Sequence, residues 1–248
     1  MTRPPMNEQP LLSIDDLEIR YGTVAAVRSV SLTVPTGQVV ALLGPNGAGK
    51  TSVLSSIMGL IQPSAGAITF DGHSLLGLKP ETIARRGIAL VAEGRNIFGD
   101  LTVEENLRLG MVARRSPEGR SQDLEQTLDL FPIVKQFLQR QAGLLSGGQQ
   151  QQLAIARAMV SDPRLLLLDE PSLGLAPAII DTVFESLDAI RSQGRTILLV
   201  EQRATRAAAF ADRSHVIANG TIRLSIDRTD TENIDSTDDR IAKAYFGA

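Results

Sequence analysis

The sequence predicts an α/β fold with a mostly parallel central sheet, and three features of its apolar pattern indicate this class. Four compact apolar runs, each followed closely by a polar residue or a glycine, read as buried parallel strands: 38–43, 88–91, 165–168 and 196–200. A helical pattern over 49–60 begins at a glycine-rich turn directly after the first run. Asn219-Gly220 separates two short strand-like segments, which is typical of a β-hairpin. Because parallel strands align their carboxyl ends, we expect polar residues to gather along one edge of the sheet.

The amino-terminal segments predict a second, antiparallel β subdomain. Residues 12–21 and 27–34 have strand character and are separated by a Tyr-Gly break. Residues 67–70 form a further strand-like run that leads into an Asp-Gly turn. Residues 1–11 are mostly polar and rich in proline, and they lack the apolar core of a signal peptide. We therefore expect a disordered tail there.

The middle of the chain, between about 94 and 160, has helical periodicity and no strand-like runs. Thr102 and Glu105 fit a capping box at the start of one helix. We expect a helical subdomain inserted between two strands of the sheet, within a single domain that covers 12–225. Residues 226–248 read as an acidic tail with a short helix from about 240 to 246.

Length and composition limit the classes of function. The chain has 248 residues, 43% of them apolar, which is enough for one sizeable core. A net charge of −3 gives no support to general nucleic-acid binding, and the lack of cysteine excludes disulfides and thiolate sites. The two histidines, His73 and His215, are far apart in sequence, which argues against a histidine-rich metal site. No apolar stretch approaches the roughly 18 residues of a membrane-spanning helix, so we expect a cytoplasmic protein.

Residues 44–51 (GPNGAGKT) match the pattern G-x-x-x-x-G-K-[ST] between a predicted strand and a predicted helix. Glycines let the chain curl until successive backbone N–H groups face a polyphosphate, and the helix N-terminus favours the same anion. In such a loop Lys50 reaches the β- and γ-phosphates, and the Thr51 hydroxyl ligates Mg²⁺. The pattern predicts a polyphosphate site at the end of a strand.

The apolar run 165–168 ends in two carboxylates, Asp169 and Glu170. Asp169 follows the strand where the metal of a bound nucleotide would lie, and we expect it to hold a metal-bound water. Glu170 faces the other way, toward an attacking water. That is the position of a general base, an effect worth roughly 10²–10⁴ in rate. Together with the phosphate loop, this pair predicts nucleotide hydrolysis.

A second glycine-rich segment, residues 145–149 (LSGGQ), runs into the helical pattern QQQLAIARA. Ser146, Gly147 and Gly148 would form another anion-binding nest at a helix N-terminus. With this segment the chain resembles the ABC (ATP-binding cassette) ATPase family, whose signature is L-S-G-G-Q followed by an Arg-Ala helix. The resemblance covers about 12–224 and implies a P-loop NTPase fold. It also implies a head-to-tail dimer, in which the phosphate loop of one subunit and the signature of the other enclose each ATP.

The resemblance implies which residues hold ATP and Mg²⁺. Tyr21 stands where the family places an aromatic residue that stacks on adenine, with a plain strand tyrosine as the alternative. The implied ATP contacts are Tyr21, Gly44, Pro45, Asn46, Gly47, Ala48, Gly49, Lys50, Thr51 and Ser52, with Ser146, Gly147, Gly148 and Gln149. The implied metal ligands are Thr51, Glu93 and Asp169, and the implied catalytic residues are Lys50, Glu170 and Gln202.

Three positions depart from the common family pattern. Glu93 stands where many relatives have a metal-contacting glutamine, and it adds a charge. Gln202 stands where a histidine often contacts the γ-phosphate. Its amide can donate a hydrogen bond but cannot become cationic, and a simple polar strand end is the alternative. Ala176 replaces a common aspartate. The segments VAEGR, LTVEENL, DEPSLGLAP and LLVEQ narrow the resemblance to the shorter ATPase subunit of bacterial branched-chain amino acid importers.

This resemblance implies an importer ATPase, peripheral at the cytoplasmic face of the cell membrane. It implies docking on two membrane-spanning permease subunits through residues 93–98, where Arg95 and Phe98 either contact the permease or pack within the lobe. It also implies a second ATPase subunit, in a heterodimer or a homodimer, and an indirect link to a solute-binding protein. The solute stays open, because related systems carry urea, amides or aromatic acids.

Other classes of P-loop protein fit the sequence less well. ABC ATPases that act on nucleic acid are usually split by long coiled coils, and no heptad array separates the phosphate loop from the signature here. Translation-type ABC proteins carry two cassettes, and P-loop kinases lack the signature. We therefore expect no nucleic-acid partner.

Overall fold

The computed structural model describes residues 9–114, 118–228 and 234–246. Within them the strands are β1 (Leu12–Tyr21), β2 (Val24–Val34), β3 (Val39–Leu43), β4 (Ala65–Phe70), β5 (His73–Ser74), β6 (Ile88–Val91), β7 (Leu165–Asp169), β8 (Thr196–Glu201), β9 (Arg213–Ala218) and β10 (Thr221–Asp227). The helices are α1 (Lys50–Ile57), α2 (Pro80–Arg85), α3 (Val103–Gly110), α4 (Arg120–Leu130), α5 (Pro132–Gln136), α6 (Gly147–Met159), α7 (Pro177–Ser192), α8 (Ala204–Phe210) and α9 (Ile234–Phe246). Two single 3₁₀ turns, η1 (Met111–Ala113) and η2 (Ala142–Leu144), lie between them. No helix in these ranges is long and apolar enough to cross a bilayer.

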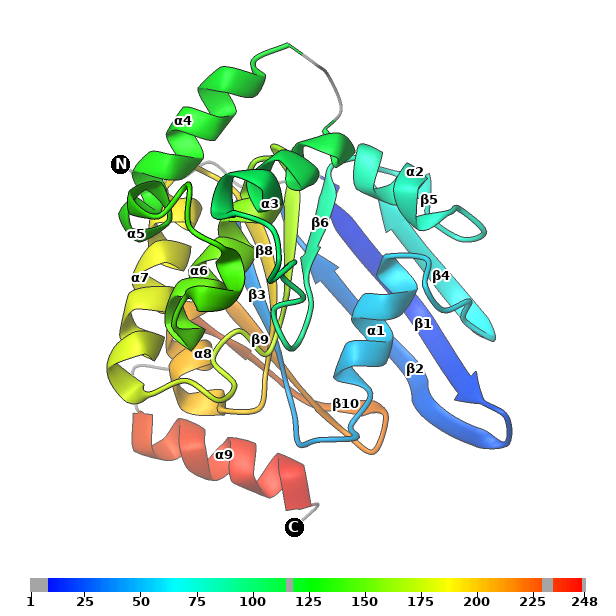
Figure 1. The fold of residues 1–248 in the computed structure, drawn as a ribbon. Helices are drawn as coiled ribbons and strands as arrows, with labels where there is room; N and C mark the ends of the chain where they lie inside the picture. Colours follow the sequence, from blue (N-terminus) through cyan, green and yellow to red (C-terminus); the bar gives the residue numbers. More distant parts are fainter. Residues whose placement is uncertain (1–8, 115–117, 229–233, 247–248) are drawn as a thin grey trace, which may run out of the picture.

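The central sheet has six strands in the order β10-β9-β3-β8-β7-β6 (Figure 1). Strands β9, β3, β8, β7 and β6 run parallel, and β10 pairs antiparallel with β9 across the predicted Asn219-Gly220 hairpin. Every residue of β3, β7 and β8 is buried, because layers of structure cover both faces of the sheet. The predicted mostly parallel sheet is confirmed.

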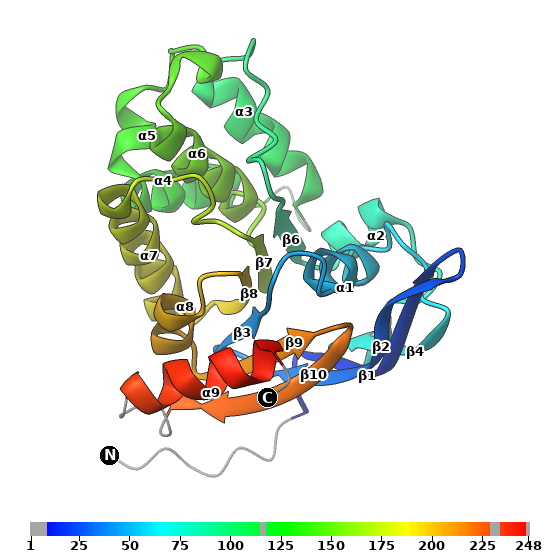
Figure 2. The same cartoon turned by 90° about the horizontal axis from the view of Figure 1, so that it is seen from below.

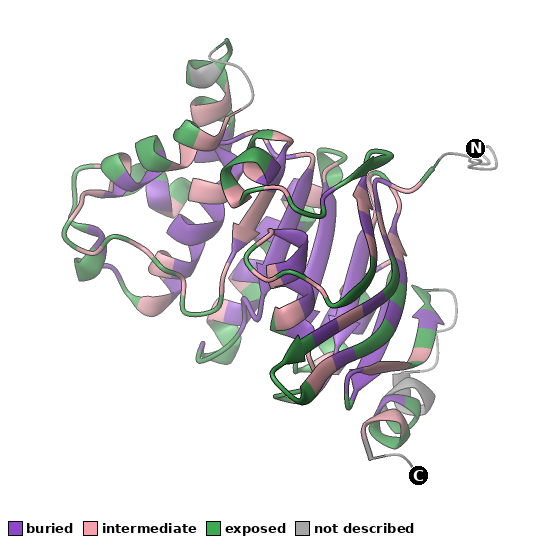
Figure 3. Ribbon diagram, turned by 90° about the vertical axis from the view of Figure 1, so that its right-hand side faces the viewer, coloured by how far each residue is buried: buried purple, intermediate pink, exposed green. Residues whose placement is uncertain are grey.

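Alternate residues of β3 enter two different apolar cores. Val39, Ala41 and Leu43 pack in the core that also contains residues of α3 to α9. Val40 and Leu42 pack on the opposite face with residues of α1 and the second sheet. Figure 3 shows the resulting buried centre, with exposed residues on the outer helices and loops. The sheet is thus the middle layer of the molecule.

The second sheet is antiparallel, in the order β2-β1-β4-β5, which confirms the predicted β subdomain. It begins earlier than the tail prediction allows. Leu11 was expected in a disordered tail, but its side chain is buried and its carbonyl accepts a hydrogen bond from the Asp71 N–H at 2.8 Å. Apolar contact and this bond draw Leu11 into the sheet region. Residues 1–8 of the predicted tail lie outside the described residues.

Helices α3 to α6 occupy the chain between β6 and β7, and they form a lobe at one end of the molecule (Figure 2). The predicted capping box starts α3. The Glu105 N–H donates to Thr102 Oγ1 at 3.2 Å, and the Thr102 N–H donates to Glu105 Oε2 at 2.7 Å. These two bonds satisfy backbone donors that a helix start otherwise leaves without partners.

The carboxyl-terminal segment differs from the predicted acidic tail. Strand β10 continues to Asp227, and the side chain of Ile226 is buried. Helix α9 begins at Ile234 instead of about 240, and it packs against β9, β10 and α8 (Figure 1). Ile241, Ala244 and Tyr245 join the main core at spacings of three and four residues, which form one apolar face. Residues 229–233 lie outside the described residues.

His215 of β9 is a buried histidine that must stay neutral in the native state. Its side chain is 7% exposed, and its Nδ1 lies 2.8 Å from the Ser225 hydroxyl oxygen, while its Nε2 is buried without a partner. Burial, with a contribution from the charge of Arg213, lowers the pKa of His215 to about 4. The ordinary value, 6.5, applies to the unfolded chain.

We expect the native state to become less stable below pH 6.5 because of His215. Between about pH 6.5 and 4 the unfolded chain binds a proton at this residue and the native state does not. The free energy of unfolding should therefore fall from this source by about 2 kcal/mol between pH 7 and 5. Urea titrations of wild type and His215→Gln at both pH values measure the difference. His73→Gln, at an exposed histidine, is the control, and equal pH dependence in all three proteins would contradict the prediction.

Candidate functional site

The candidate site lies at the carboxyl edge of the parallel sheet, where three neighbouring strands end level with one another. In the register of the sheet, Leu43 of β3 pairs with Glu201 of β8, and Asp169 of β7 pairs with Val200. The phosphate loop follows β3, Glu170 follows Asp169 at the end of β7, and Gln202 follows β8. Residues far apart in the chain therefore meet at one edge, as the apolar runs predicted.

The phosphate loop connects β3 to α1 with little room for side chains. Gly49 has a φ of 105°, and a Cβ there would lie 2.6 Å from the Ala26 carbonyl oxygen. A Cβ on Gly44 would lie 2.3 Å from the Ile217 carbonyl oxygen. Glycine is therefore needed at both ends of the loop, for its backbone angle at Gly49 and for close packing at Gly44.

Lys50 is almost completely buried and its ammonium group has three protein partners. Its Nζ donates to the carbonyl oxygens of Gly44 at 2.8 Å and of Pro45 at 3.1 Å, and it lies 3.0 Å from Glu170 Oε1. Both partners of this ion pair are under 10% exposed, at 4% and 8%. A buried charge needs such compensation. A phosphate entering the loop would compete with Glu170 for the same cation.

Asp169 and Thr51 form the part of the site that could hold a metal. The Thr51 hydroxyl donates to Asp169 Oδ1 at 3.3 Å. Burial raises the pKa of Asp169, and the charges of Glu170 and Glu93 act in the same direction, against the hydrogen bond from Thr51. A divalent cation would relieve this accumulation of negative charge.

Mg²⁺ fits this donor set when a nucleotide is present. Among the described residues, no group of three or more His, Cys, Asp or Glu side chains forms a metal cage of its own. Mg²⁺ is usually held by one or two carboxylates together with substrate phosphates, and a hydroxyl beside a carboxylate supplies the protein's share. Glu93 is exposed and lines a cleft that Thr51 also lines.

Glu170 has a backbone conformation that is uncommon for a residue with a side chain. Its φ is 46°, in the left-handed region, which costs roughly 1 kcal/mol. The Glu170 N–H donates to the Val200 carbonyl at 2.9 Å, and the Leu173 N–H donates to the Glu170 carbonyl at 3.1 Å. These bonds hold a tight turn at the end of β7, and the turn directs the carboxylate toward Lys50.

A cleft of about 440 Å³ brings half of the predicted nucleotide residues together. Its lining consists of Tyr21, Ala26, Asn46, Gly47, Gly49, Lys50, Thr51, Ser52, Glu93 and Glu170. Tyr21 is 51% exposed, and its hydroxyl oxygen lies 3.2 Å from the Ser52 hydroxyl oxygen. An exposed aromatic residue therefore lines the cleft. Gln202 follows β8 at the same sheet edge but lies outside this lining.

The second glycine-rich segment lies apart from the cleft. Ser146 caps α6, since the Ser146 N–H donates to Gln149 Oε1 at 2.9 Å and the Gln149 N–H donates to Ser146 Oγ at 3.4 Å. A Cβ on Gly148 would lie 2.4 Å from Ile179 Cγ2, so α6 and α7 pack closely there. None of the residues Ser146, Gly147, Gly148 and Gln149 lines the cleft that contains the phosphate loop.

Glu201 is a buried carboxylate at this edge that the sequence analysis did not single out. It is 2% exposed and its Oε1 accepts a hydrogen bond from the Ser172 N–H at 3.0 Å. The available signal was a charged residue that ends an otherwise apolar strand, TILLVE.

Residues 27–173 match the family model described as ABC transporter. The chain belongs to the ABC transporter family. An ABC relative from Pseudomonas aeruginosa, described as the high-affinity branched-chain amino acid transport ATP-binding protein BraG, is 44% identical over 96% of this chain and 100% of its own length. The probable branched-chain amino acid transport ATP-binding protein LivF of Archaeoglobus fulgidus is 34% identical over 84% of this chain and 89% of its own.

The fold agrees with solved ABC cassettes. A nucleotide-free ATP-binding cassette from an ABC transporter superposes with a TM-score of 0.85 at 25% identity, covering 97% of this chain and 100% of that one. The α/β ABC ATPase fold and the resemblance to branched-chain importer subunits are thus confirmed. In this ABC cassette, residues of the phosphate loop line the cleft, and the LSGGQ segment begins helix α6 of the lobe.

We expect Tyr21→Ala to weaken nucleotide binding if the exposed ring stacks on a base. Stacking on a base face is worth roughly 1–3 kcal/mol, which corresponds to an increase in Kd of about 5-fold to 150-fold. Tyr21→Phe keeps the ring and loses only the contact to Ser52, so its Kd should stay close to that of wild type. Fluorescence titration with a labelled ATP analogue measures both. Equal affinity in Tyr21→Ala and wild type would show that this is a plain strand tyrosine.

Proposed function

We propose that this ABC protein is the ATP-hydrolysing subunit of an importer for branched-chain amino acids, the class named for its relatives BraG and LivF. The observation that carries the proposal is the 44% identity to BraG along the full length of that protein. A different small solute, such as urea, an amide or an aromatic acid, is the alternative, because an ATPase subunit contains no solute site.

In the proposed reaction the phosphate loop binds ATP through its backbone N–H groups, and Lys50 binds the β- and γ-phosphates. Lys50 then exchanges its ion pair with Glu170, now 3.0 Å long, for the phosphate oxygens. Glu170 is released by this exchange and acts as the general base toward water. The ion pair thus restrains the base until a nucleotide arrives.

Mg²⁺, when bound with ATP, would neutralise charge on the transferred phosphate. Thr51 and Asp169 would hold it, and Glu93 lies close enough to the cleft to contribute an oxygen. Gln202 would donate its amide N–H to the γ-phosphate after a movement toward the cleft. Because it stays neutral, it adds less charge stabilisation than an imidazolium would.

We propose that Ser146, Gly147, Gly148 and Gln149 complete the site of a second ATPase subunit. The capped end of α6 offers backbone N–H groups to an anion, and none of these four residues lines the cleft that contains the phosphate loop. A heterodimer with a different ATPase subunit and a homodimer both satisfy this geometry.

We further propose that two membrane-spanning permease subunits dock on the groove between the sheet and the lobe, at the cytoplasmic face of the membrane. A cavity of about 370 Å³ lies there, lined in part by Leu90, Phe98, Leu109 and Arg157. Phe98 is 53% exposed, and the Arg157 guanidinium lies 5.6 Å from its ring centre. Arg95 instead packs within the lobe, since its guanidinium donates to Gln150 Oε1 at 3.3 Å.

Arg157 joins this groove to the signature helix. It is a residue of α6, and its guanidinium donates to the carbonyl oxygens of Asn96 at 2.8 Å and Arg95 at 3.3 Å. Movement of a docked permease segment would therefore be transmitted to α6, which begins at the signature. A solute-binding protein would act indirectly, through the permease.

We expect Glu170→Gln to lower ATP turnover at least about 100-fold, because an amide cannot accept the proton of the attacking water. The affinity for Mg-ATP should persist, and the ATP-bound protein should accumulate as a dimer. Steady-state phosphate release, a binding titration and size-exclusion chromatography measure the three quantities. Turnover within about 3-fold of wild type would remove Glu170 from the role of base.

We expect membrane partners to bind through the apolar surface of Phe98. Affinity purification of Glu170→Gln with Mg-ATP from solubilised native membranes should recover two multi-spanning proteins and a second ATPase. In the Glu170→Gln background, Phe98→Glu should lose the multi-spanning proteins and keep ATP binding, because it places a charge in the groove, whereas Phe98→Leu should keep both. Recovery of soluble or nucleic-acid partners only would contradict the transport proposal and leave the ATPase chemistry standing.

A further inference from the structure

Glu201 is a carboxylate buried at the end of β8 without a cationic partner. Within the described residues, no lysine, arginine or histidine forms an ion pair with it. Its Oε1 accepts a hydrogen bond from the Ser172 N–H at 3.0 Å, and burial raises the pKa of Glu201 against the effect of hydrogen bonds from the Ser172 hydroxyl and from the Ser172 and Gln202 N–H groups. Burial of an unpaired carboxylate lowers stability by several kcal/mol. An apolar residue would fit an apolar strand at less cost, so the group has a use other than stability.

Glu201 lies where it links the segments that the proposed reaction needs. Its backbone carbonyl accepts from the Gly44 N–H at 3.3 Å, at the start of the phosphate loop. Its side chain accepts from Ser172, two residues after Glu170. The Glu170 N–H itself bonds to the carbonyl of Val200, the residue before Glu201. The turn that carries Glu170 is therefore attached to β8 at two points, one of them the Glu201 side chain.

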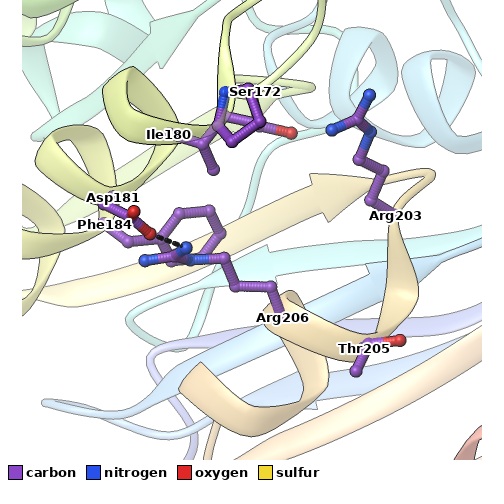
Figure 4. A pocket seen from close by; sticks show the side chains of 8 residues that line it. Ser172, Ile180, Asp181, Phe184, Arg203, Thr205 and Arg206 are labelled. Atoms are coloured by element: carbon purple, nitrogen blue, oxygen red, sulfur yellow. Dashed lines mark hydrogen bonds and ion pairs between the residues drawn. The ribbon is translucent and has the colours of Figure 1, made fainter.

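The other side of this turn faces a cavity. Ser172 lines a cavity of about 490 Å³ that lies between α7 and α8 (Figure 4). An ion pair between Arg206 and Asp181 lies along the cavity, with the Arg206 guanidinium 4.8 Å from the Phe184 ring centre. Ser172 is buried at 4% exposure, but the cavity gives the turn room to move on that side, and the hydrogen bonds to β8 oppose that movement.

We propose that Glu201 is a positioning residue for ATP hydrolysis, which keeps the turn at Glu170–Leu173 in the geometry that presents Glu170 to the attacking water. The proposal rests on the proposed function, in which Glu170 is the base. Glu170 has a left-handed φ of 46°, which the surrounding hydrogen bonds must maintain. Without the Glu201 acceptor, one of these bonds is lost. The turn then relaxes toward the cavity, and Glu170 is presented at the correct position for a smaller fraction of the time.

The test compares Glu201→Ala with Glu201→Gln in the full-length chain. Glu201→Ala removes the acceptor and should lower kcat between about 10-fold and 100-fold, because a small displacement of a catalytic group has effects of this size. KM for ATP should change less than about 2-fold, since ATP binds through the phosphate loop. Glu201→Gln keeps an amide oxygen for the Ser172 N–H and should retain kcat within about 3-fold. Glu185→Gln removes a matched, exposed carboxylate of α7 and should behave as wild type.

A double-mutant cycle separates this proposal from the function on which it rests. If Glu201 acts through Glu170, then adding Glu201→Ala to Glu170→Gln should cause no further loss of turnover. A full further loss in that background, or unchanged kcat in Glu201→Ala, would overturn the positioning role. Wild-type turnover in Glu170→Gln alone would instead refute the base assignment. Hydrogen exchange of the 168–176 peptide should become faster in Glu201→Ala and stay slow in Glu201→Gln.

If Glu201→Ala does not fold, Glu201→Asp is the second variant. Aspartate keeps the charge and is one methylene shorter, so it cannot span the 3.0 Å contact to the Ser172 N–H without moving the turn. Reduced kcat at unchanged KM, with faster exchange of the same peptide, would support the proposal. Wild-type kcat in Glu201→Asp would overturn it.

Discussion

The parallel pairing of β3, β8 and β7 is the interaction on which the rest of the site depends. Backbone hydrogen bonds set the three strands level, so Leu43, Glu201 and Asp169 end at one edge although they are far apart in the chain. All their residues are buried, and two apolar cores, one on each face, pack the sheet against the helices and the second sheet. A shift of one residue in this register would turn every side chain of a strand to the opposite face.

Negative charge accumulates where these strands end. Asp169, Glu170 and Glu201 are all buried, and Lys50 is the cation that contacts them, through Glu170. Burial raises the pKa of both Asp169 and Glu201, so the site is electrostatically incomplete without a cation. A bound magnesium nucleotide would supply a divalent cation beside Asp169 and an anion beside Lys50. Among these three carboxylates, Glu170 is the one that forms an ion pair with Lys50.

The sequence was sufficient for the parts of the fold that local pattern determines. Four apolar runs predicted the parallel strands, Asn219-Gly220 predicted the hairpin, and Thr102 with Glu105 predicted the start of α3. It was insufficient where tertiary packing decides. Helix α9 packs against β9 and β10, and these tertiary contacts leave no local signal in the sequence. For the site, the loop and acidic pair were evident from motifs, whereas Glu201 became visible only with its contact to Ser172.

The main core has a consequence for how the helical lobe relates to the body of the protein. Val103 and Leu107 of the lobe, Leu168 of the sheet and Leu187 of α7 all belong to one continuous apolar cluster. Helix α6 contributes to both parts, because it contacts β6 on one side and α3 and α5 on the other. The lobe is therefore not a detachable module. Its excision would strip one face of the sheet, and exchange of lobes between cassettes would require matched residues along the whole length of α6.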